Sequence, residues 1–314
     1  MKRLRQRTLK NSIHCSGIGL HGGDRVAMTL HPAAAGTGIL FRRTDIAGGQ
    51  AEIRATWENG IETPLCTTIQ SDDGVRIATI EHLMSAFYGC GIDNAVVELN
   101  GGEVPIMDGS AAPFVFLIDC AGTVELDTPR RALRVLKPVT VDDGERSASL
   151  CPGGALSVHF EIDFDSPIVD RQEWFTQIGE ATYKREIARA RTFGFLQDVD
   201  RLRAMGLAQG GSLNNAIVVS GDRVLNEGGL RFENEFVRHK VLDSVGDLFL
   251  IGAPIVGHFY GLRAGHSLTL RLVRQLMADE SAWEWIVPTE DDLAIQDGAT
   301  GAVVPPMRAV AAHA

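Results

Sequence analysis

Three polar residues in the segment 232–249 have the types and spacing to hold a divalent metal ion. His239, Asp243 and Asp247 follow one another at intervals of four, so on a helix they share one narrow stripe. An imidazole and a carboxylate at i and i+4 lie about 6 Å apart at their β-carbons, close enough to bind one ion together. The alternative is that this stripe is the solvated face of an amphipathic helix, which such a pattern more often indicates. A third ligand from elsewhere in the chain is needed to decide.

A second group of candidate residues lies in the segment 76–94. Its apolar residues repeat at helical spacing until two glycines end the run, which predicts a helix. Glu81 and His82 are adjacent there and point about 100° apart, so that one can bind a metal while the other accepts a proton from water. His21 is a weaker candidate, because a histidine in a glycine-rich turn most often faces solvent. Its flanking glycines nevertheless permit close approach of a ligand.

The two halves of the chain share an order of elements. The helix bearing His82 precedes a strand, a loop and a helix that begins near Ser110, 28 positions later. The helix bearing His239 likewise precedes a strand, a loop and a helix that begins near His266, 27 positions later. We therefore expect an α+β fold of two similar layered domains, each a β-sheet packed on helices, with the helices facing each other and the active site between them. This arrangement lets His82 join His239 and Asp243 as the third ligand.

The length of 314 residues predicts two domains. Residues 1–125 are expected to form an N-terminal α+β domain and residues 137–290 a C-terminal one. Residues 126–136 have the charges and proline of a linker. An apolar insert near 192–213 has glycines that suit a hinged lid, although core packing explains such apolar runs more often. Residues 291–314 are poor in bulky side chains, and we expect them to be a mobile tail.

The composition is that of a soluble globular protein, with 45% hydrophobic and 22% charged residues. A formal net charge of -10 argues against nucleic-acid binding.

The basic run at 1–10 is followed by polar residues, where a signal peptide needs an apolar segment of about 7 to 15 residues. The apolar stretch 248–262 contains a proline and a histidine and is too short to span a bilayer. Five cysteines without a CxxC pair favour reduced thiols. We expect a cytoplasmic monomer that does not insert stably into a membrane.

The candidate residues fit the parts of a zinc amidase. Two imidazoles and one carboxylate leave a fourth position on zinc open, as in catalytic sites. Glu81 would take a proton from water activated there. The departing amine needs a cationic acid, and His266 fits, with Asp247 as the carboxylate that keeps it protonated. Lys240 lies on the same face of its helix, where it either binds an anionic part of the substrate or is an exposed lysine without a partner.

Five motifs carry a resemblance to a known family: IEHLMSAFYGCGIDN, PIMDGSAAPF, RARTFGF, NEGGLRFENEFVRHKVLDSVGDLFL and RAGHSLT. With them the chain resembles, over about residues 6–287, the zinc-dependent UDP-3-O-acyl-N-acetylglucosamine deacetylases of lipid A biosynthesis. The resemblance implies an α+β fold of two similar layers and one zinc ion per chain. It implies that Glu81 is the general base and that His266 with Asp247 forms the acid side. The implied zinc ligands are His82, His239 and Asp243.

The resemblance also implies how the substrate is bound. Thr192 would donate its hydroxyl to the oxyanion, and Lys240 would contact the polar end of the substrate. Phe193 would flank the sugar or the nucleotide, and Phe164 would stack on the uracil. The expected substrate is therefore a UDP-linked, acylated glucosamine.

In the family an insert forms a passage for the fatty acyl chain, and the segment 196–211 resembles it, with Gly210 and Gly211 lining the passage. The implied reaction is zinc-dependent hydrolysis of the N-acetyl group of UDP-3-O-[(3R)-3-hydroxyacyl]-N-acetylglucosamine, an early committed step of lipid A biosynthesis. Two alternatives stay open. One is a metal amidase for a peptide or another N-acyl sugar, and the other is a non-catalytic protein that binds a sugar nucleotide or a lipid.

Overall fold

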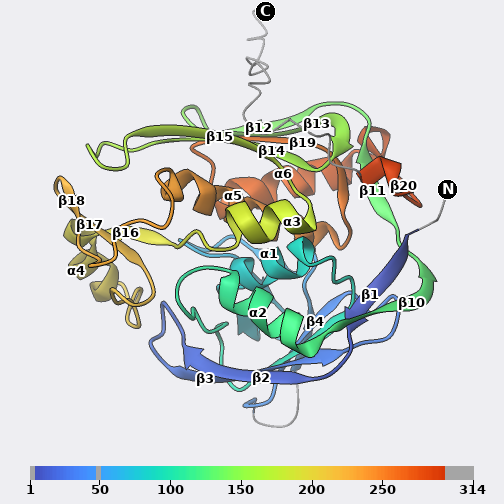
Figure 1. The fold of residues 1–314 in the computed structure, drawn as a ribbon, viewed down its shortest axis with the longest axis horizontal. Coiled ribbons are helices and arrows are strands. Elements are labelled where there is room, and N and C mark those ends of the chain that lie inside the picture. The colour runs from blue at the N-terminus through green and yellow to red at the C-terminus, as the bar shows by residue number, and fades with distance from the viewer. Residues whose placement is uncertain (1–3, 47–50, 294–314) are drawn as a thin grey trace, which may run out of the picture.

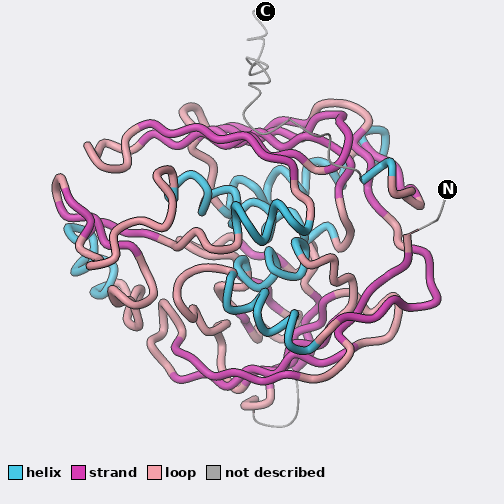
Figure 2. Tube along the Cα trace, viewed as in Figure 1, coloured by secondary structure: helices cyan, strands magenta, loops and turns pink. Residues whose placement is uncertain are grey.

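Two β-sheet layers enclose a central layer of helices (Figure 1). The computed structural model describes residues 4–46 and 51–293. Figure 2 shows most of the helices in the middle of the molecule, with strands on two opposite outer sides. The predicted α+β class, with layered sheets and helices that face each other, is confirmed. No helix among the described residues is long and apolar enough to cross a membrane.

The first layer is a five-stranded sheet in the order β2-β3-β9-β4-β5. The expected alternation in β3 is present, since Val26, Met28 and Leu30 are buried and their neighbours are more exposed. Two helices, α1 (Glu81–Gly89) and α2 (Ala112–Ala121), lie on the inner side of this layer (Figure 1). The strands are β2 (Ile13–Ile18), β3 (Arg25–Pro32), β4 (Ile39–Arg43), β5 (Ala51–Arg54) and β9 (Ala95–Leu99).

The second layer is a seven-stranded sheet around β19 (Ile255–Leu262), which pairs with strands on both sides. Its inner face is covered by α5 (Glu235–Leu248) and α6 (His266–Ala278) (Figure 1). Three short helical turns accompany them, η2 (Phe249–Ile251), η3 (Glu280–Ala282) and η4 (Asp291–Leu293). The other strands are β11 (Ala132–Val135), β12 (Val139–Asp142), β13 (Ser147–Ala155), β14 (Ser157–Asp163), β15 (Arg171–Gln177) and β20 (Trp283–Ile286).

Smaller elements connect and flank the two layers. The segment expected as an insert, near 192–213, and the two strands that follow it form a small sheet with one helix, which projects from one side of the molecule (Figure 1). A short helix α3 (Glu180–Thr182) continues into the π-helical turn η1 (Tyr183–Ile187). The expected insert contains β16 (Phe193–Phe195) and α4 (Leu196–Ala204), and β17 (Ile217–Ser220) and β18 (Arg223–Val224) follow it in the chain. The remaining strands are β1 (Arg5–Leu9), β6 (Gly60–Ile61), β7 (Thr68–Gln70), β8 (Arg76–Ile77) and β10 (Thr123–Pro129).

Helices from the two halves cross at two glycines. A side chain on Gly246 of α5 would overlap the carbonyl oxygen of Glu81 at the start of α1. A side chain on Gly89, at the other end of α1, would overlap the ring of Tyr183. Tyr183 is fully buried, and its hydroxyl donates to Ser85 Oγ at 2.9 Å. The two glycines therefore allow α1 to lie close against the C-terminal half.

One segment differs from the sequence expectation, and another is described only in part. Residues 126–136, expected as a linker, largely belong to strands β10 and β11. Their backbone groups pair with β1, β19 and β20, so the hydrogen bonds of these sheets override the charged composition of the segment. In the expected mobile tail 291–314, Asp291–Leu293 form a turn of helix, and residues 294–314 lie outside the described part of the chain.

Candidate metal centre and active site

The polar stripe of α5 is buried. His239, Asp243 and Asp247 are only 2%, 5% and 3% exposed. The apolar side of the helix is buried as well, as Val241 and Val245 show. The stripe faces the interior between the layers, where α1 and α6 pack against α5. The alternative of a solvated helix face is therefore wrong, because buried polar groups need partners or a ligand.

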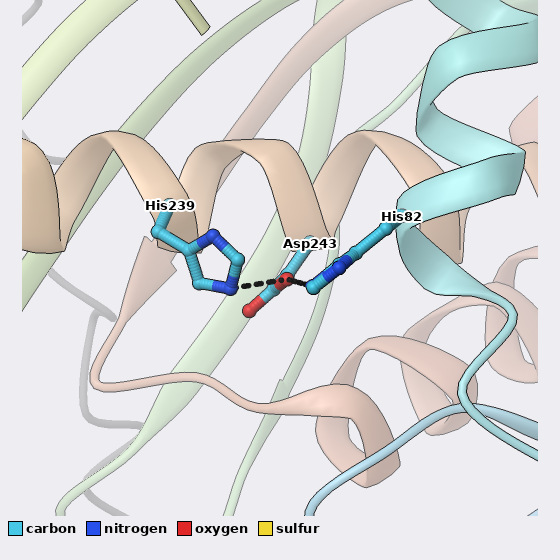
Figure 3. A group of neighbouring side chains, drawn as sticks. All are labelled: His82, His239 and Asp243. Carbon is cyan, nitrogen blue, oxygen red and sulfur yellow. Dashed lines mark ion pairs between the residues drawn. The ribbon is translucent and has the colours of Figure 1, made fainter. Parts of the chain in front are cut away.

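His82 of α1 meets His239 and Asp243 of α5. Their ligand atoms all lie within 4.8 Å of one another, and no other such group occurs among the residues that the structure describes. Asp243 Oδ1 lies 3.2 Å from His239 Nε2 and 3.5 Å from His82 Nε2. Figure 3 shows the two imidazoles turned toward this carboxylate from different helices. The third ligand expected from the N-terminal half is thus in reach of the other two.

The protonation of His239 and Asp243 fits a bound metal. His239 Nδ1 donates to the carbonyl oxygen of Ala190 at 3.0 Å, which leaves Nε2 with its lone pair. Burial lowers the pKa of His239 to about 3, so the ring is neutral near pH 7. Burial alone would raise the pKa of Asp243, but His239 and Lys240 hold it well below its usual range. Asp243 Oδ1 is buried without a hydrogen-bond donor. A neutral imidazole with its lone pair on Nε2 and a carboxylate oxygen that lacks a donor fit a divalent metal ion.

One carboxylate oxygen of Glu81, the first residue of α1, is held by a hydrogen bond, and the other is available to accept a proton. Its Oε2 accepts the backbone N–H of Thr67 at 3.0 Å, while its Oε1 lies 3.9 Å from His266 Nε2. The side chain is buried next to the candidate ligand His82. Burial is the main cause of a raised pKa for this carboxyl, with His266 and His82 acting against it. A fixed carboxylate of raised basicity beside a metal site suits a general base.

His266, the first residue of α6, is paired with Asp247. Its Nδ1 donates to Asp247 Oδ2 at 2.9 Å, so Asp247 lies against the imidazole and is not part of the three-ligand group. Burial alone would lower the pKa of His266, but Asp247 and Glu81 raise it to about 9. The imidazole is therefore protonated near neutral pH. A buried carboxylate and a protonated imidazole thus flank the three candidate metal ligands, as a general base and a cationic acid would.

The family model described as UDP-3-O-acyl N-acetylglycosamine deacetylase matches residues 6–278. The chain belongs to this family. A UDP-3-O-acyl-N-acetylglucosamine deacetylase of Acidithiobacillus ferrooxidans is 55% identical over 285 residues, which cover 90% of this chain and 93% of the relative. Proteins of the same name from Marinobacter nauticus and Chromohalobacter salexigens are 51% and 50% identical over 291 residues, which cover 92% of this chain and 94% and 95% of theirs. The resemblance inferred from the five motifs is confirmed.

In this member of the deacetylase family Lys240 is paired with a candidate ligand. Its Nζ lies 2.6 Å from Asp243 Oδ2. Burial alone would lower the pKa of Lys240, but Asp243 raises it. The alternative of an exposed lysine without a partner is therefore wrong. Contact with the substrate stays a prediction, supported by the position of Lys240 with His266 in the lining of one small cavity.

Thr192 is held in the segment that also supports His239. Its backbone N–H donates to the carbonyl of Gly109 at 2.8 Å. The preceding residue, Arg191, is fixed by Glu235 at the start of α5, through bonds of 3.0 Å from the backbone N–H and 2.8 Å from Nε. Glu235 is fully buried. Sequence reasoning missed this support, since Arg191 and Glu235 are far apart in the chain and neither is part of an acid-base or metal-ligand pattern.

The phenylalanines predicted to bind the sugar nucleotide form one aromatic cluster. The rings of Phe164 and Phe193 lie 5.5 Å apart between centroids, in an edge-to-face arrangement. Phe195 lies 5.7 Å from Phe164, and Phe236 of α5 lies 5.0 Å from Phe193. The structure therefore brings the two predicted residues together, although they are far apart in the sequence. Neither ring is assigned to a particular part of the substrate by these contacts.

The two insert glycines differ in their surroundings. Gly210 donates its N–H to the carbonyl of Leu20 at 3.0 Å, and a side chain there would overlap the carbonyl oxygen of Gly19. A Cβ on Gly211 would lie 3.3 Å from the Ala208 carbonyl oxygen. His21 is buried where the insert meets this turn. The sequence favoured a solvent-facing His21, but the end of the insert covers the turn. The insert thus docks on the glycine-rich turn of the first layer.

Proposed function

We propose that this chain uses zinc to hydrolyse the N-acetyl group of UDP-3-O-[(3R)-3-hydroxyacyl]-N-acetylglucosamine, a step of lipid A biosynthesis. One observation carries the proposal: the three candidate ligands converge between Glu81 and His266, in a chain that matches the deacetylase family over residues 6–278. Relatives with more than 90% of their length matched carry the name of this activity. The products are acetate and the free glucosamine amine.

Zinc suits the donor set of two imidazoles and one carboxylate, and three protein ligands are typical of catalytic zinc. His82, His239 and Asp243 would hold it. When bound, zinc supplies Lewis-acid polarisation of the acetamide carbonyl and lowers the pKa of water toward about 7. Lys240, on the second oxygen of Asp243, orients that carboxylate.

Glu81 acts as the general base. Its Oε1 takes a proton from the water whose oxygen attacks the acetyl carbonyl carbon. The Thr67 N–H on Oε2 limits rotation of the carboxylate. Burial, which raises the pKa of Glu81, makes it a stronger base than an exposed glutamate. The Thr192 hydroxyl donates to the negative charge that develops on the carbonyl oxygen.

His266 acts as the general acid. As the bond between the carbonyl carbon and the nitrogen breaks, His266 Nε2 gives its proton to the nitrogen, and the amine leaves. Asp247 holds the imidazole from the other side, at Nδ1. One proton is removed from water and one is delivered to nitrogen, so acetate and the amine are formed without a further reactant.

The remaining predicted residues bind the rest of the substrate. Phe164 and Phe193 offer aromatic edges and faces for the uracil and the sugar. The insert, with Gly210 and Gly211, accommodates the acyl chain. We also expect a monomer in a reducing, cytoplasmic compartment, because one chain supplies all three ligands and its five cysteines lack a CxxC pair.

Acetate release from three substrates tests the proposal. They are the 3-O-acylated UDP-N-acetylglucosamine, the same sugar nucleotide without the acyl chain, and an N-acetylated peptide. We expect kcat/KM for the acylated substrate to exceed the other two by roughly 100-fold or more, because remote binding energy contributes to the transition state. Equal rates would overturn the substrate assignment. Tight binding of the acylated sugar nucleotide with no acetate release would indicate a binding protein instead.

A further inference from the structure

Thr67 bridges the two ends of the candidate active site. Its backbone N–H donates to Glu81 Oε2 at 3.0 Å. Its hydroxyl donates to Asp247 Oδ1 and lies 3.1 Å from His266 Nδ1. The residue is only 6% exposed. The proposed base and the proposed acid, which come from different halves of the chain, thus share one neighbour.

We propose that Thr67 is a positioning residue that fixes the acid side of this site through its hydroxyl and the base through its amide. The inference rests on the proposed function, because it assumes that His266 delivers a proton. Thr67 itself touches neither reacting atom; it acts through Asp247 and Glu81. Nothing in its sequence surroundings marks it, because its partners lie 14, 180 and 199 positions away.

The hydroxyl has one proton, and the carboxylate of Asp247 can only accept it. Thr67 therefore donates to Oδ1, while His266 Nδ1 donates to Oδ2 at 2.9 Å. Two donors on two oxygens fix the plane of the carboxylate. The lone pairs of the Thr67 oxygen remain free to accept from the same Nδ1–H at 3.1 Å. Both contacts hold the imidazole at Nδ1, and its Nε2 lies 3.9 Å from Glu81 Oε1.

The backbone of Thr67 is itself fixed. It immediately precedes β7, which pairs with both β6 and β8. Its carbonyl accepts the N–H of Ile80, the residue before Glu81, at 3.3 Å. A β-branched side chain has few χ1 rotamers, so a fixed backbone also limits where the hydroxyl can lie. A side-chain substitution removes the hydroxyl and leaves the amide for Glu81 in place, which isolates the acid side.

Thr67→Val is the test variant, because it removes the hydroxyl and keeps the shape. Thr67→Ser is the conservative variant that restores it. Thr68→Val is the matched control, since Thr68 is adjacent and buried but its hydroxyl bonds to Thr63 at 2.8 Å, outside the acid-base group. Each metal-loaded protein is assayed for kcat, KM, metal content and folding by circular dichroism.

We expect Thr67→Val to lower kcat about 10- to 100-fold, with KM within about twofold and metal content unchanged, because only the orientation of the acid is lost. Thr67→Ser should recover kcat to within about threefold, and Thr68→Val should stay near the wild type. A Thr67→Val enzyme with wild-type kcat overturns the proposal, as does an equal loss in Thr68→Val or a loss of bound metal. If Thr67→Val does not fold, Thr67→Ala is judged by the same criteria.

A spectroscopic measurement separates this inference from the proposed function. The proton on His266 Nδ1 is observed by NMR in metal-loaded wild-type and Thr67→Val proteins. We expect its resonance to shift when the hydroxyl is removed, whatever substrate the protein uses. An unchanged resonance overturns the inference even if the wild type is an active deacetylase. A wild type that releases no acetate contradicts the proposed function, while a shifted resonance still supports the bridge.

Discussion

Asp243 and Asp247 lie one helical turn apart, and their neighbours give two identical side chains different chemistry. Asp243 Oδ1 faces two imidazole nitrogens, and Lys240 pairs with its second oxygen. Asp247 instead accepts hydrogen bonds from Thr67 and His266. One aspartate is therefore suited to a metal ion and the other to a protonated histidine.

Glu81→Gln separates catalysis from metal binding. The amide has the same shape but cannot accept a proton from water, so we expect kcat to fall roughly 10²- to 10⁴-fold while the metal content stays near one per chain. Metal analysis and acetate release on the same samples check this. Glu52→Gln, a surface change of the same kind, should be neutral. Loss of the metal together with activity would show that Glu81 is a ligand or a structural residue.

His266 should make the stability of the metal-free protein depend on pH. Its pKa is raised from 6.5 to about 9 in the folded state, so the folded state holds the proton more tightly than the unfolded state. The resulting stabilisation, of the order of 3 kcal/mol, is fully present below about pH 6.5 and is lost as the pH rises through about 9. Urea unfolding of the wild type and His266→Gln from pH 6 to 10 measures it. A difference between them that does not shrink with rising pH would refute this assignment.

At the scale of elements, the site depends on how closely α1 and α5 approach. The apolar periodicity of both helices was sufficient to predict that they exist and which residues they bear. Their ends were not predictable, because the start of the run at 76–94 is used by strand β8 and α1 begins only at Glu81. The contacts by which Thr67 and Glu235 support the site were not predictable for a related reason. Such contacts depend on tertiary packing and leave no periodic pattern in the sequence.

Gly246→Ala tests the crossing of these helices. A methyl group there would overlap the Glu81 carbonyl, so we expect the free energy of unfolding to fall by about 2 kcal/mol and metal affinity to drop as His82 moves from its partners. Gly154→Ala is the control, because a Cβ at that position meets nothing within 4 Å. Wild-type stability and metal affinity in Gly246→Ala would mean that the close approach is unimportant.

Gly210→Ala tests how the insert docks. The added methyl group would overlap the Gly19 carbonyl and push the insert from the turn at His21. If the insert accommodates the acyl chain, KM for the acylated substrate should rise about tenfold with a smaller change in kcat. Gly194→Ala, in the same insert with no atom within 4 Å of its Cβ, is the matched control. An equal effect in both variants would argue against a docking role.

For the whole molecule, the central fact is that each layer contributes to one site. His82 comes from the N-terminal half and His239 from the C-terminal half, and their rings lie 4.9 Å apart. The repeated order of elements predicted this meeting, since two similar layers with facing helices bring corresponding helices together. The sequence could not predict that most of residues 126–136 belong to strands, because their pairing partners lie in distant parts of the chain.

The most direct test of the central claim is acetate release from the acylated UDP-N-acetylglucosamine. It is measured on one preparation before metal removal, after metal removal and after zinc is restored. We predict turnover in the first state, less than about 1% of it in the second, and recovery in the third with about one zinc per chain. Undiminished acetate release by protein from which the metal has been removed would contradict the account.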